Sequence, residues 1–253
     1  MNPFSLQNKI VLIAGASSGI GYECAVKCAQ MGANLLLLGR NMERLEKVKN
    51  EVEVCGVHVE VISVDITNVT ELESVIAAFV SKYGKFDGFV HSAGIEKTLP
   101  VVNLKQSDYI DILKINAFAG FELCKLLSKK KYGNEGASFV LISSITSMIG
   151  RAGLTAYSAS KGAINAGIRP IAIEIASKKM RVNAICPGTI LTPLMLKFLD
   201  TLTEEEKFKR NSGYLLGLGE CADVANLVLF LLSDGSRWIT GQSIAIDGGY
   251  TIQ

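Results

Sequence analysis

Short apolar runs alternate with longer amphipathic stretches along most of the chain. The apolar runs are rich in Val, Ile and Leu and predict strands at residues 10–14, 35–38, 57–64, 86–91, 138–142, 181–185 and 243–246. The stretches between them predict helices at residues 20–31, 42–55, 70–83, 107–130, 157–178 and 222–233. Strands that are apolar along their whole length are typical of a parallel sheet covered by helices on both faces. The pattern therefore predicts an α/β fold with a doubly wound parallel β-sheet of the Rossmann type, in three α/β/α layers.

One segment, residues 189–219, departs from this alternation because it contains no clear strand. It holds the sequence Leu-Met-Leu-Lys-Phe-Leu at residues 194–199 and then charged residues up to Lys209. We expect a pair of short helices inserted after a strand end, and such an insertion favours a substrate lid. No linker-like or repetitive tract occurs, so residues 1–253 are predicted to form a single domain.

Composition and charge narrow the classes of partner. The 253 residues are 49% hydrophobic with a mean hydropathy of +0.31, which indicates a large core. Together with the carboxyl-terminal strand and its apolar neighbours 228–232, this composition also indicates self-association of the chain. A net charge of +2 gives no reason to expect nucleic acid or a membrane surface as a partner. With no apolar leader and no stretch of about 18 apolar residues, a cytoplasmic protein is expected. Six cysteines and two histidines lack metal-ligand spacing, so no metal site is expected.

A glycine-rich turn follows the first predicted strand and precedes the first predicted helix. It reads Ala-Gly-Ala-Ser-Ser-Gly-Ile-Gly over residues 14–21. Glycines allow close approach of a ligand to the backbone, and the free N–H groups at a helix N-terminus attract phosphate. A helix entry whose small residues serve only packing is the alternative. The position of the turn favours the pyrophosphate site of a dinucleotide, formed by Gly15, Ser17, Ser18, Gly19, Ile20 and Gly21.

The end of the second predicted strand bears on which dinucleotide is bound. A carboxylate there binds the ribose 2′-hydroxyl of NAD(H), whereas an arginine accommodates the 2′-phosphate of NADP(H). Here Gly39 is followed by Arg40 and Asn41, and the first carboxylate is Glu43. Arg40, assisted by Ser17, therefore favours NADP(H), with NAD(H) as the alternative.

The segment from Ser144 to Lys161 combines a hydroxyl, a phenol and an ammonium. Tyr157 and Lys161 are four residues apart, so they share one face of a helix. An ammonium beside a phenol stabilises the phenolate, and we expect Lys161 to lower the pKa of Tyr157 from about 10. Such a phenol can act as an acid or a base near neutral pH. For this pair taken alone, a solvated helix face is the alternative.

Five motifs follow one another along the chain: Gly15-x-x-x-Gly19-Ile-Gly21, Asn116, Ser144, Tyr157-x-x-x-Lys161 and Pro187-Gly188. Their order and spacing resemble those of the short-chain dehydrogenase/reductases. The chain is similar to this family over nearly its whole length, and within it to the 3-oxoacyl-[acyl-carrier-protein] reductase type.

The resemblance implies roles for four catalytic residues. Tyr157 would be the general acid/base at the substrate oxygen, and Lys161 would bind the nicotinamide ribose and lower the pKa of Tyr157. Ser144, rather than its neighbour Ser143, would orient the substrate oxygen. Asn116 would hold a water molecule in a proton relay to the lysine.

The resemblance also implies further cofactor contacts. Asp65 would contact the adenine, although a capping role is its alternative, and Thr192 would lie near the nicotinamide carboxamide. The other implied positions are Ile66, Ser92, Ala93, Gly94, Pro187, Gly188 and Ile190. Where the family usually reads Asn-Asn-Ala-Gly, this chain has His91-Ser-Ala-Gly. We expect His91 to be a core residue hydrogen-bonded within the sheet rather than a second catalytic base.

Together these features predict an NADP(H)-dependent oxidoreductase that interconverts a ketone and a secondary alcohol by hydride transfer. A 3-oxoacyl thioester is one candidate substrate, and a sugar-derived or other small polar ketone is the alternative. A non-catalytic dinucleotide-binding protein is the alternative from another class, but it would be expected to have lost Ser144, Tyr157 or Lys161. An acyl carrier protein is a candidate partner through Lys178 and Lys179. The resemblance implies a homotetramer, with a dimer as the alternative. Residues expected to line the substrate pocket are Glu96, Arg151, 194–198 and Tyr214.

Overall fold

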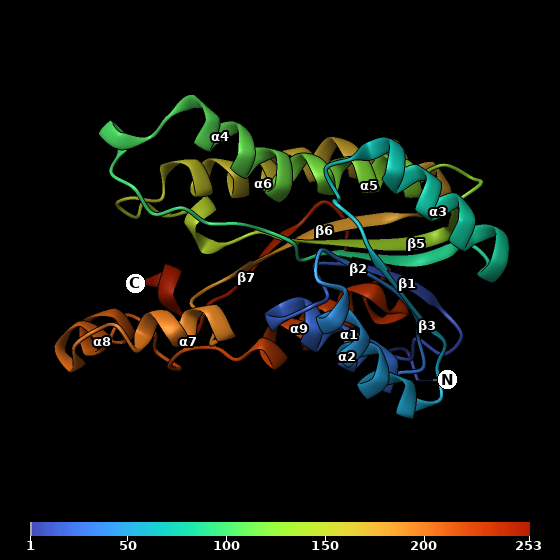
Figure 1. Ribbon diagram of the computed structural model, residues 1–253, viewed down its shortest axis with the longest axis horizontal. Coiled ribbons are helices and arrows are strands. Elements are labelled where there is room, and N and C mark those ends of the chain that lie inside the picture. The colour runs from blue at the N-terminus through green and yellow to red at the C-terminus, as the bar shows by residue number, and fades with distance from the viewer. Residues whose placement is uncertain (1) are drawn as a thin grey trace.

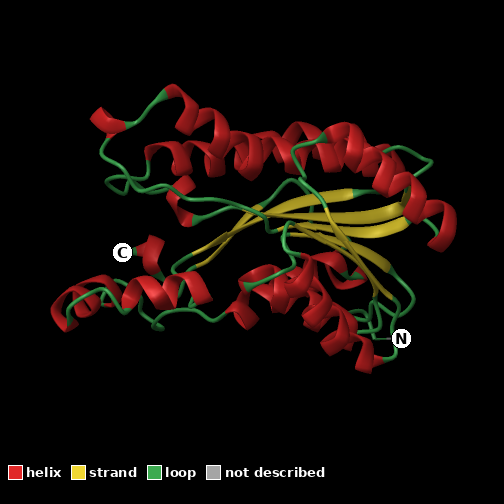
Figure 2. Ribbon diagram, viewed as in Figure 1, coloured by secondary structure: helices red, strands yellow, loops and turns green. Residues whose placement is uncertain are grey.

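A twisted seven-stranded sheet runs through the computed structural model, which describes residues 2–253 (Figures 1 and 2). Its order is β3-β2-β1-β4-β5-β6-β7, and every neighbouring pair is parallel. The strands are β1 (Ile10–Ala14), β2 (Asn34–Gly39), β3 (Val59–Ser63), β4 (Phe86–His91), β5 (Gly133–Ile142), β6 (Arg181–Pro187) and β7 (Ser243–Ile246). The order reverses between β1 and β4, so a crevice opens at the carboxyl ends of these strands. The predicted doubly wound three-layer fold is confirmed.

Helices cover both faces of the sheet, as the apolar strands require. One core cluster joins one face to α3 (Val69–Tyr83), α5 (Ala119–Leu127) and α6 (Thr155–Ile175). The other joins the opposite face to α1 (Gly19–Gln30), α2 (Met42–Val52) and α9 (Cys221–Leu232). Figure 1 shows these two groups above and below the sheet. Alternate residues of each strand thus face different helices, which explains why the strands are apolar throughout.

The helix expected at residues 107–130 is in fact three elements. α4 (Gln106–Leu113) continues into a π-helical turn, η3 (Lys114–Phe118), and then into α5. A π-turn widens the helix and alters the direction of its carbonyl groups, and it is often found at functional sites. The expectation of one regular helix was therefore wrong at the turn that contains Asn116.

The segment 189–219 contains the expected pair of short helices, α7 (Pro193–Leu199) and α8 (Glu204–Asn211). Each helix follows a threonine whose hydroxyl accepts a backbone N–H from the first turn. Thr192 accepts the N–H of Met195 before α7, and Thr203 accepts the N–H of Glu206 before α8. Such N-caps fix where a helix starts. In Figure 1 the two helices lie below the carboxyl-terminal end of β7 and project to the left of the sheet.

The apolar residues 228–232 lie within α9. Val228, Leu231 and Leu232 are buried in the core of the same chain, whereas Leu229 and Phe230 pack against it and are partly exposed, as is β7. Self-association through this part of the chain stays a prediction. Among residues 2–253, no helix is both long and apolar enough to cross a membrane.

Candidate active site

The glycine turn after β1 is in tight contact with the residues that follow β4. Gly15 has a φ of 89°, and a Cβ there would lie 2.7 Å from Ala93 Cα. A Cβ at Gly21 would overlap the Gly15 carbonyl oxygen and Ser92 Oγ. Ser92 donates both its N–H and its hydroxyl to the Ala14 carbonyl, at 2.9 and 2.8 Å. Only glycine fits this arrangement, which leaves the turn open for a ligand to approach its backbone.

The N-terminus of α1 is suited to bind an anion. α1 begins at Gly19, its N-cap Ser18 makes no side-chain capping bond, and the first turn has no acidic residue. Its first N–H groups therefore remain available for a phosphate, which the helix dipole also favours. Ser17 precedes this end and Ile20 continues it. A Cβ on Gly19 would lie 3.3 Å from Thr192 Cγ2, so the turn faces the start of α7.

Two predicted adenosine contacts lie at the ends of β2 and β3. Arg40 directly follows β2, is exposed, and accepts a hydrogen bond from Ser63 Oγ at its carbonyl, 3.1 Å away. Asp65 accepts the N–H and hydroxyl of Thr67 at 2.9 and 2.8 Å, and these bonds lower the pKa of its carboxyl. The local turn that was the alternative for Asp65 is therefore present. Ile66 is buried beside it.

The phenol of Tyr157 lies near Ser144, at the start of α6. Ser144 Oγ accepts the N–H and hydroxyl of Thr146, at 3.2 and 3.0 Å. Burial raises the pKa of Tyr157 above its usual range, and the charge of Glu96 adds to this, while a hydrogen bond with Ser144 opposes it. The expectation that Lys161 lowers this pKa is not met within the chain itself, because desolvation of the phenolate outweighs every favourable contact.

Lys161 is buried and directed at the end of β5. Its Nζ donates to the Ile142 carbonyl at 2.7 Å and lies 5.5 Å from the centroid of the Tyr157 ring. Burial lowers the pKa of Lys161 to about 8. Ser143, by contrast, binds backbone only: it donates its N–H to Ile185 and its hydroxyl to the Lys161 carbonyl, at 2.7 and 3.0 Å. Of the two serines, Ser144 is therefore the one beside the phenol.

Asn116 is completely buried, and its amide joins the π-turn to the segment after β4. Its Nδ2 donates to the Ile95 carbonyl at 2.9 Å and to Ser160 Oγ at 3.0 Å, while its Oδ1 accepts the Ile95 N–H at 2.8 Å. A Cβ on Gly94 would lie 3.3 Å from Asn116 Oδ1 and 3.7 Å from Lys161 Nζ. The amide therefore fixes the chain at Gly94, close to the lysine ammonium.

His91 binds the π-turn and not the sheet. Its Nε2 lies 3.1 Å from both the Ile115 and Asn116 carbonyls, so this nitrogen donates to them. Burial lowers the pKa of His91 to about 4, so the ring is neutral. The expectation of a hydrogen bond within the sheet was therefore wrong. A Cβ on Gly120 would lie 2.8 Å from His91 Cδ2, so the next helical turn also needs a glycine.

The residues that follow β6 form the opposite wall of the crevice. Gly188 donates its N–H to the β7 carbonyl of Ile246 at 2.9 Å, which continues the sheet past Pro187. Thr189 bonds to the Tyr214 hydroxyl with its N–H and its Oγ1, at 3.0 and 2.7 Å. Ile190 is buried and forms an isolated bridge with Gly219. The last two contacts join the two ends of the segment 189–219 to each other, next to the end of β6.

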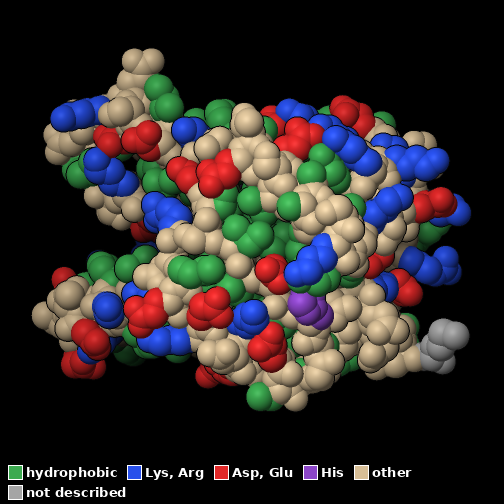
Figure 3. All heavy atoms as spheres, turned by 45° about the vertical axis from the view of Figure 1, so that its right-hand side comes forward, with side chains coloured by type: hydrophobic (Ala, Val, Ile, Leu, Met, Phe, Trp, Pro, Cys, Tyr) green, Lys and Arg blue, Asp and Glu red, His purple; other side chains and the backbone are tan. Residues whose placement is uncertain are grey.

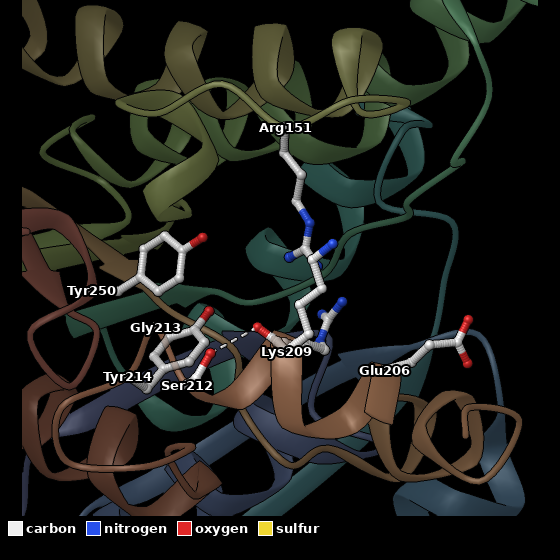
Figure 4. A pocket seen from close by; sticks show the side chains of 8 residues that line it. Arg151, Glu206, Lys209, Ser212, Gly213, Tyr214 and Tyr250 are labelled. Atoms are coloured by element: carbon white, nitrogen blue, oxygen red, sulfur yellow. Dashed lines mark hydrogen bonds between the residues drawn. The ribbon is translucent and has the colours of Figure 1, made fainter. Parts of the chain in front are cut away.

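A cavity of about 390 Å³ opens between this segment and the loop before α6 (Figure 4). In the space-filling view the molecule is hollowed on its left side, between the α4 end and the α7–α8 end (Figure 3). Arg151 and Tyr214 line the cavity, as expected, whereas Glu96 and residues 194–198 are not among its lining residues. Its other lining residues were not predicted, because most lie in or beside a charged run typical of a solvated helix. These are Glu206, Lys209, Arg210, Ser212, Gly213 and Tyr250.

Comparisons with known proteins identify the family of the chain. A family described as "Enoyl-(Acyl carrier protein) reductase" matches residues 15–251. The chain is 33% identical to the 3-oxoacyl-[acyl-carrier-protein] reductase of Thermotoga maritima, over 98% of this chain and 99% of that one. It is 32% identical to the 7alpha-hydroxysteroid dehydrogenase of Escherichia coli K12, over 96% and 94% of the two chains.

A solved structure gives the same result in three dimensions. A 7 alpha-hydroxysteroid dehydrogenase complexed with NADH and 7-oxo glycochenodeoxycholic acid has a TM-score of 0.89 to this chain, at 29% identity and 98% and 96% coverage. The family match begins at Gly15 and ends at Thr251, so it includes every motif on which the resemblance rests. The chain therefore belongs to the short-chain dehydrogenase/reductase family of oxidoreductases.

Proposed function

We propose that the protein is an NADP(H)-dependent oxidoreductase that interconverts a ketone and a secondary alcohol, with Tyr157 as its general acid/base. The proposal rests on one observation: the Tyr157 phenol, with Ser144 and Lys161 beside it, stands at the crevice that the glycine turn faces. A bound nicotinamide dinucleotide would supply or accept the hydride. Residues 1–253 would form one domain, with residues 189–219 as the lid.

Residues of the chain would transfer the proton and bind the substrate oxygen. Because burial keeps Tyr157 protonated at neutral pH, the phenol can donate its proton to a carbonyl oxygen as negative charge develops there. Ser144 would donate its hydroxyl hydrogen to the same oxygen and hold it in place. Below a pH of about 8 Lys161 carries a positive charge, which stabilises the phenolate left by proton transfer. Asn116 would support a water relay that restores the proton.

The cofactor would lie across the carboxyl ends of the strands, where the residues fit it. The glycine cradle and the uncapped start of α1 suit its pyrophosphate, Asp65 and Ile66 its adenine, and Lys161 its nicotinamide ribose. The whole proposed set comprises Gly15, Ser17, Ser18, Gly19, Ile20, Gly21, Arg40, Asp65, Ile66, Ser92, Ala93, Gly94, Tyr157, Lys161, Pro187, Gly188, Ile190 and Thr192.

Arg40 supports the preference for NADP(H). Its guanidinium forms no ion pair within residues 2–253, and it stands where β2 ends. Glu43, the first carboxylate after β2, is bound to Lys47 at 2.7 Å on the surface of α2. A free guanidinium is the group that binds a 2′-phosphate through two parallel hydrogen bonds.

A small ketone is the substrate that we favour over a thioester carried on a protein. The two basic residues considered for an acidic carrier are already engaged. Lys178 donates to the Ser128 carbonyl at 2.6 Å, and Lys179 pairs with Glu135 at 2.9 Å. An acyl carrier protein would have to displace both contacts. Self-association and a cytoplasmic location complete the proposal.

The test is to follow the absorbance of NADPH and of NADH with a panel of simple ketones, sugar-derived ketones and an acetoacetyl thioester. We expect turnover with NADPH to exceed that with NADH by about tenfold or more, as one charge-assisted contact provides. Tyr157→Phe should lower kcat by about a thousandfold while the Kd for NADPH changes less than about twofold. Faster turnover with NADH would contradict the Arg40 argument. Substantial activity in Tyr157→Phe would contradict the assigned acid/base.

A further inference from the structure

The cavity between α8 and the loop before α6 is lined by more basic than acidic residues. Three basic residues line it, Arg151 from the loop before α6 and Lys209 and Arg210 from α8, against one acidic residue, Glu206. In Figure 4 the Arg151 side chain extends down toward α8, while the Glu206 carboxylate lies to the right of Lys209. Its volume of about 390 Å³ suits a small organic molecule.

The acidic residue does not neutralise these cations. Glu206 Oε2 accepts the N–H and the hydroxyl of Thr203, at 2.8 and 3.0 Å, and so closes the N-terminal capping box of α8. Within residues 2–253, neither arginine nor Lys209 has an ion-pair partner. On the same helix Lys207 is paired with Glu204 at 2.7 Å, so unpaired charge is not general on α8.

Arg210 is the least satisfied of the three. It is half-buried, its Nε has no hydrogen-bond partner, and its Nη2 reaches only Thr189 Oγ1 at 3.5 Å and Met195 Sδ at 3.7 Å. Its guanidinium lies 5.3 Å from the centroid of the Phe198 ring, which holds it in place. Burial lowers its pKa, and the charge of Arg151 lowers it further. A half-buried charge without a partner is costly, and an anion in the cavity would remove that cost.

The cavity lies on the side of the sheet where the reacting groups stand. Arg151 is in the loop that joins Ser144 to Tyr157, and Tyr214 binds Thr189 just after β6. Thr189, which Arg210 approaches, follows β6 directly after Gly188. A molecule bound at the arginines would extend past Thr189 toward the end of β6, the side on which Tyr157 stands.

We propose that the substrate carries a carboxylate, which Arg151 and Arg210 bind together while its keto group lies at Tyr157. The substrates would be oxo acids and the matching hydroxy acids, and Lys209 would add to the positive potential at the entrance. Arginine is suited to this task because its fork of N–H groups matches both carboxylate oxygens. This inference rests on the proposed function, since it assigns the substrate class of the same site.

The test compares oxo acids with their own methyl esters, in a series that places the keto group progressively further from the carboxyl. With NADPH, the wild-type protein should reduce at least one acid with a kcat/KM about tenfold to a hundredfold above that of its ester, as one or two charge-assisted contacts provide. In Arg151→Gln and in Arg210→Gln this advantage should be lost through a higher KM with kcat nearly unchanged. Lys207→Gln, on the same helix, is the matched control and should behave as wild type.

Three outcomes would contradict either the carboxylate site or the proposed function on which it rests. Esters reduced as well as acids by the wild type would overturn the carboxylate site and leave the proposed function standing. A weaker affinity for NADPH in Arg210→Gln would assign the guanidinium to the cofactor and also overturn it. Absence of turnover with every acid and every ester would contradict the proposed function. The carboxylate site would then be tested by binding alone. It predicts that an oxo acid raises the Tm of the wild-type protein but not that of Arg210→Gln.

Discussion

At the scale of single residues, if Tyr157 is the acid/base proposed above, its environment would favour the reduction of a carbonyl over the oxidation of an alcohol. Burial raises the pKa of Tyr157, so the phenol carries its proton at neutral pH and is ready to donate it. The reverse reaction needs the phenolate, which becomes more abundant as pH rises. Glu96 contributes to this balance, because its negative charge opposes the phenolate and also favours the charged form of Lys161.

Glu96→Gln should therefore move the pH profile of alcohol oxidation to lower pH. Removing the carboxylate lowers the pKa of Tyr157, so the phenolate forms earlier, and the midpoint should shift downward by up to about one pH unit. The measurement is the initial rate of NADP⁺ reduction against pH with an uncharged secondary alcohol, so that binding at the arginines plays no part. Glu135→Gln, which removes a carboxylate paired with Lys179 at the surface, is the control. An unchanged midpoint in Glu96→Gln would contradict the role given to its charge.

At the scale of secondary-structure elements, the π-turn η3 depends on His91. The neutral ring donates from Nε2 to two successive carbonyls of the turn, those of Ile115 and Asn116. The same turn carries the Asn116 amide that fixes Gly94 near Lys161. We infer that His91 is a positioning residue, because it holds the turn whose Asn116 amide fixes the chain next to Lys161.

His91→Leu should destabilise this turn and slow catalysis. Two buried carbonyls would lose their donor, which costs about 1–3 kcal/mol and lowers the Tm by several degrees. Because the folded pKa of His91 is about 4, below the usual 6.5, the unfolded chain binds more protons between these values. Stability is therefore lost as pH falls through this window in the wild type, and His91→Leu should lose less.

The measurements for this prediction are thermal unfolding between pH about 4 and about 7 and kcat with NADPH. His91→Asn, which retains an N–H donor, should recover part of the lost kcat. His58→Leu changes the other histidine, an exposed one near Glu60, and should leave kcat unaltered. Equal pH dependence of Tm in wild type and His91→Leu would count against a buried neutral ring.

The same elements indicate how far sequence reasoning reaches. The strands and the glycine turn were predictable because a covered parallel sheet demands continuous apolar runs, and because Gly15 and Gly21 have no room for a Cβ. The division of the helix expected at residues 107–130 was not predictable, because the π-turn is held by His91, which belongs to β4. Arg210 was missed for a similar reason. In the sequence it belongs to a charged helix, and only the fold removes its partners and turns it toward the cavity.

At the scale of the whole molecule, exposed apolar side chains occur on α4, η3 and α6, and Figure 1 shows α4 and α6 above the sheet. Ile110 of α4, Phe118 of η3 and Ile173 of α6 are 54%, 52% and 79% exposed, although α6 packs against both α4 and η3. Large apolar side chains on neighbouring helices indicate a surface that another chain covers. We therefore place one contact of the proposed self-association on this surface, in addition to the predicted one at residues 228–232.

Sedimentation velocity can test this placement. The wild-type protein should sediment as a dimer or tetramer, because burying three large apolar side chains on each of two facing copies favours association. The double variant Phe118→Asp/Ile173→Asp should shift toward the monomer, since each copy would have to bury two carboxylates at the contact. Phe208→Asp places the same charge on α8, at a side chain that is 75% exposed, and should leave the sedimentation coefficient unchanged. If the α8 variant dissociates and the double variant does not, the contact lies on the lid side, and association would then bear directly on access to the cavity lined by Arg151 and Arg210.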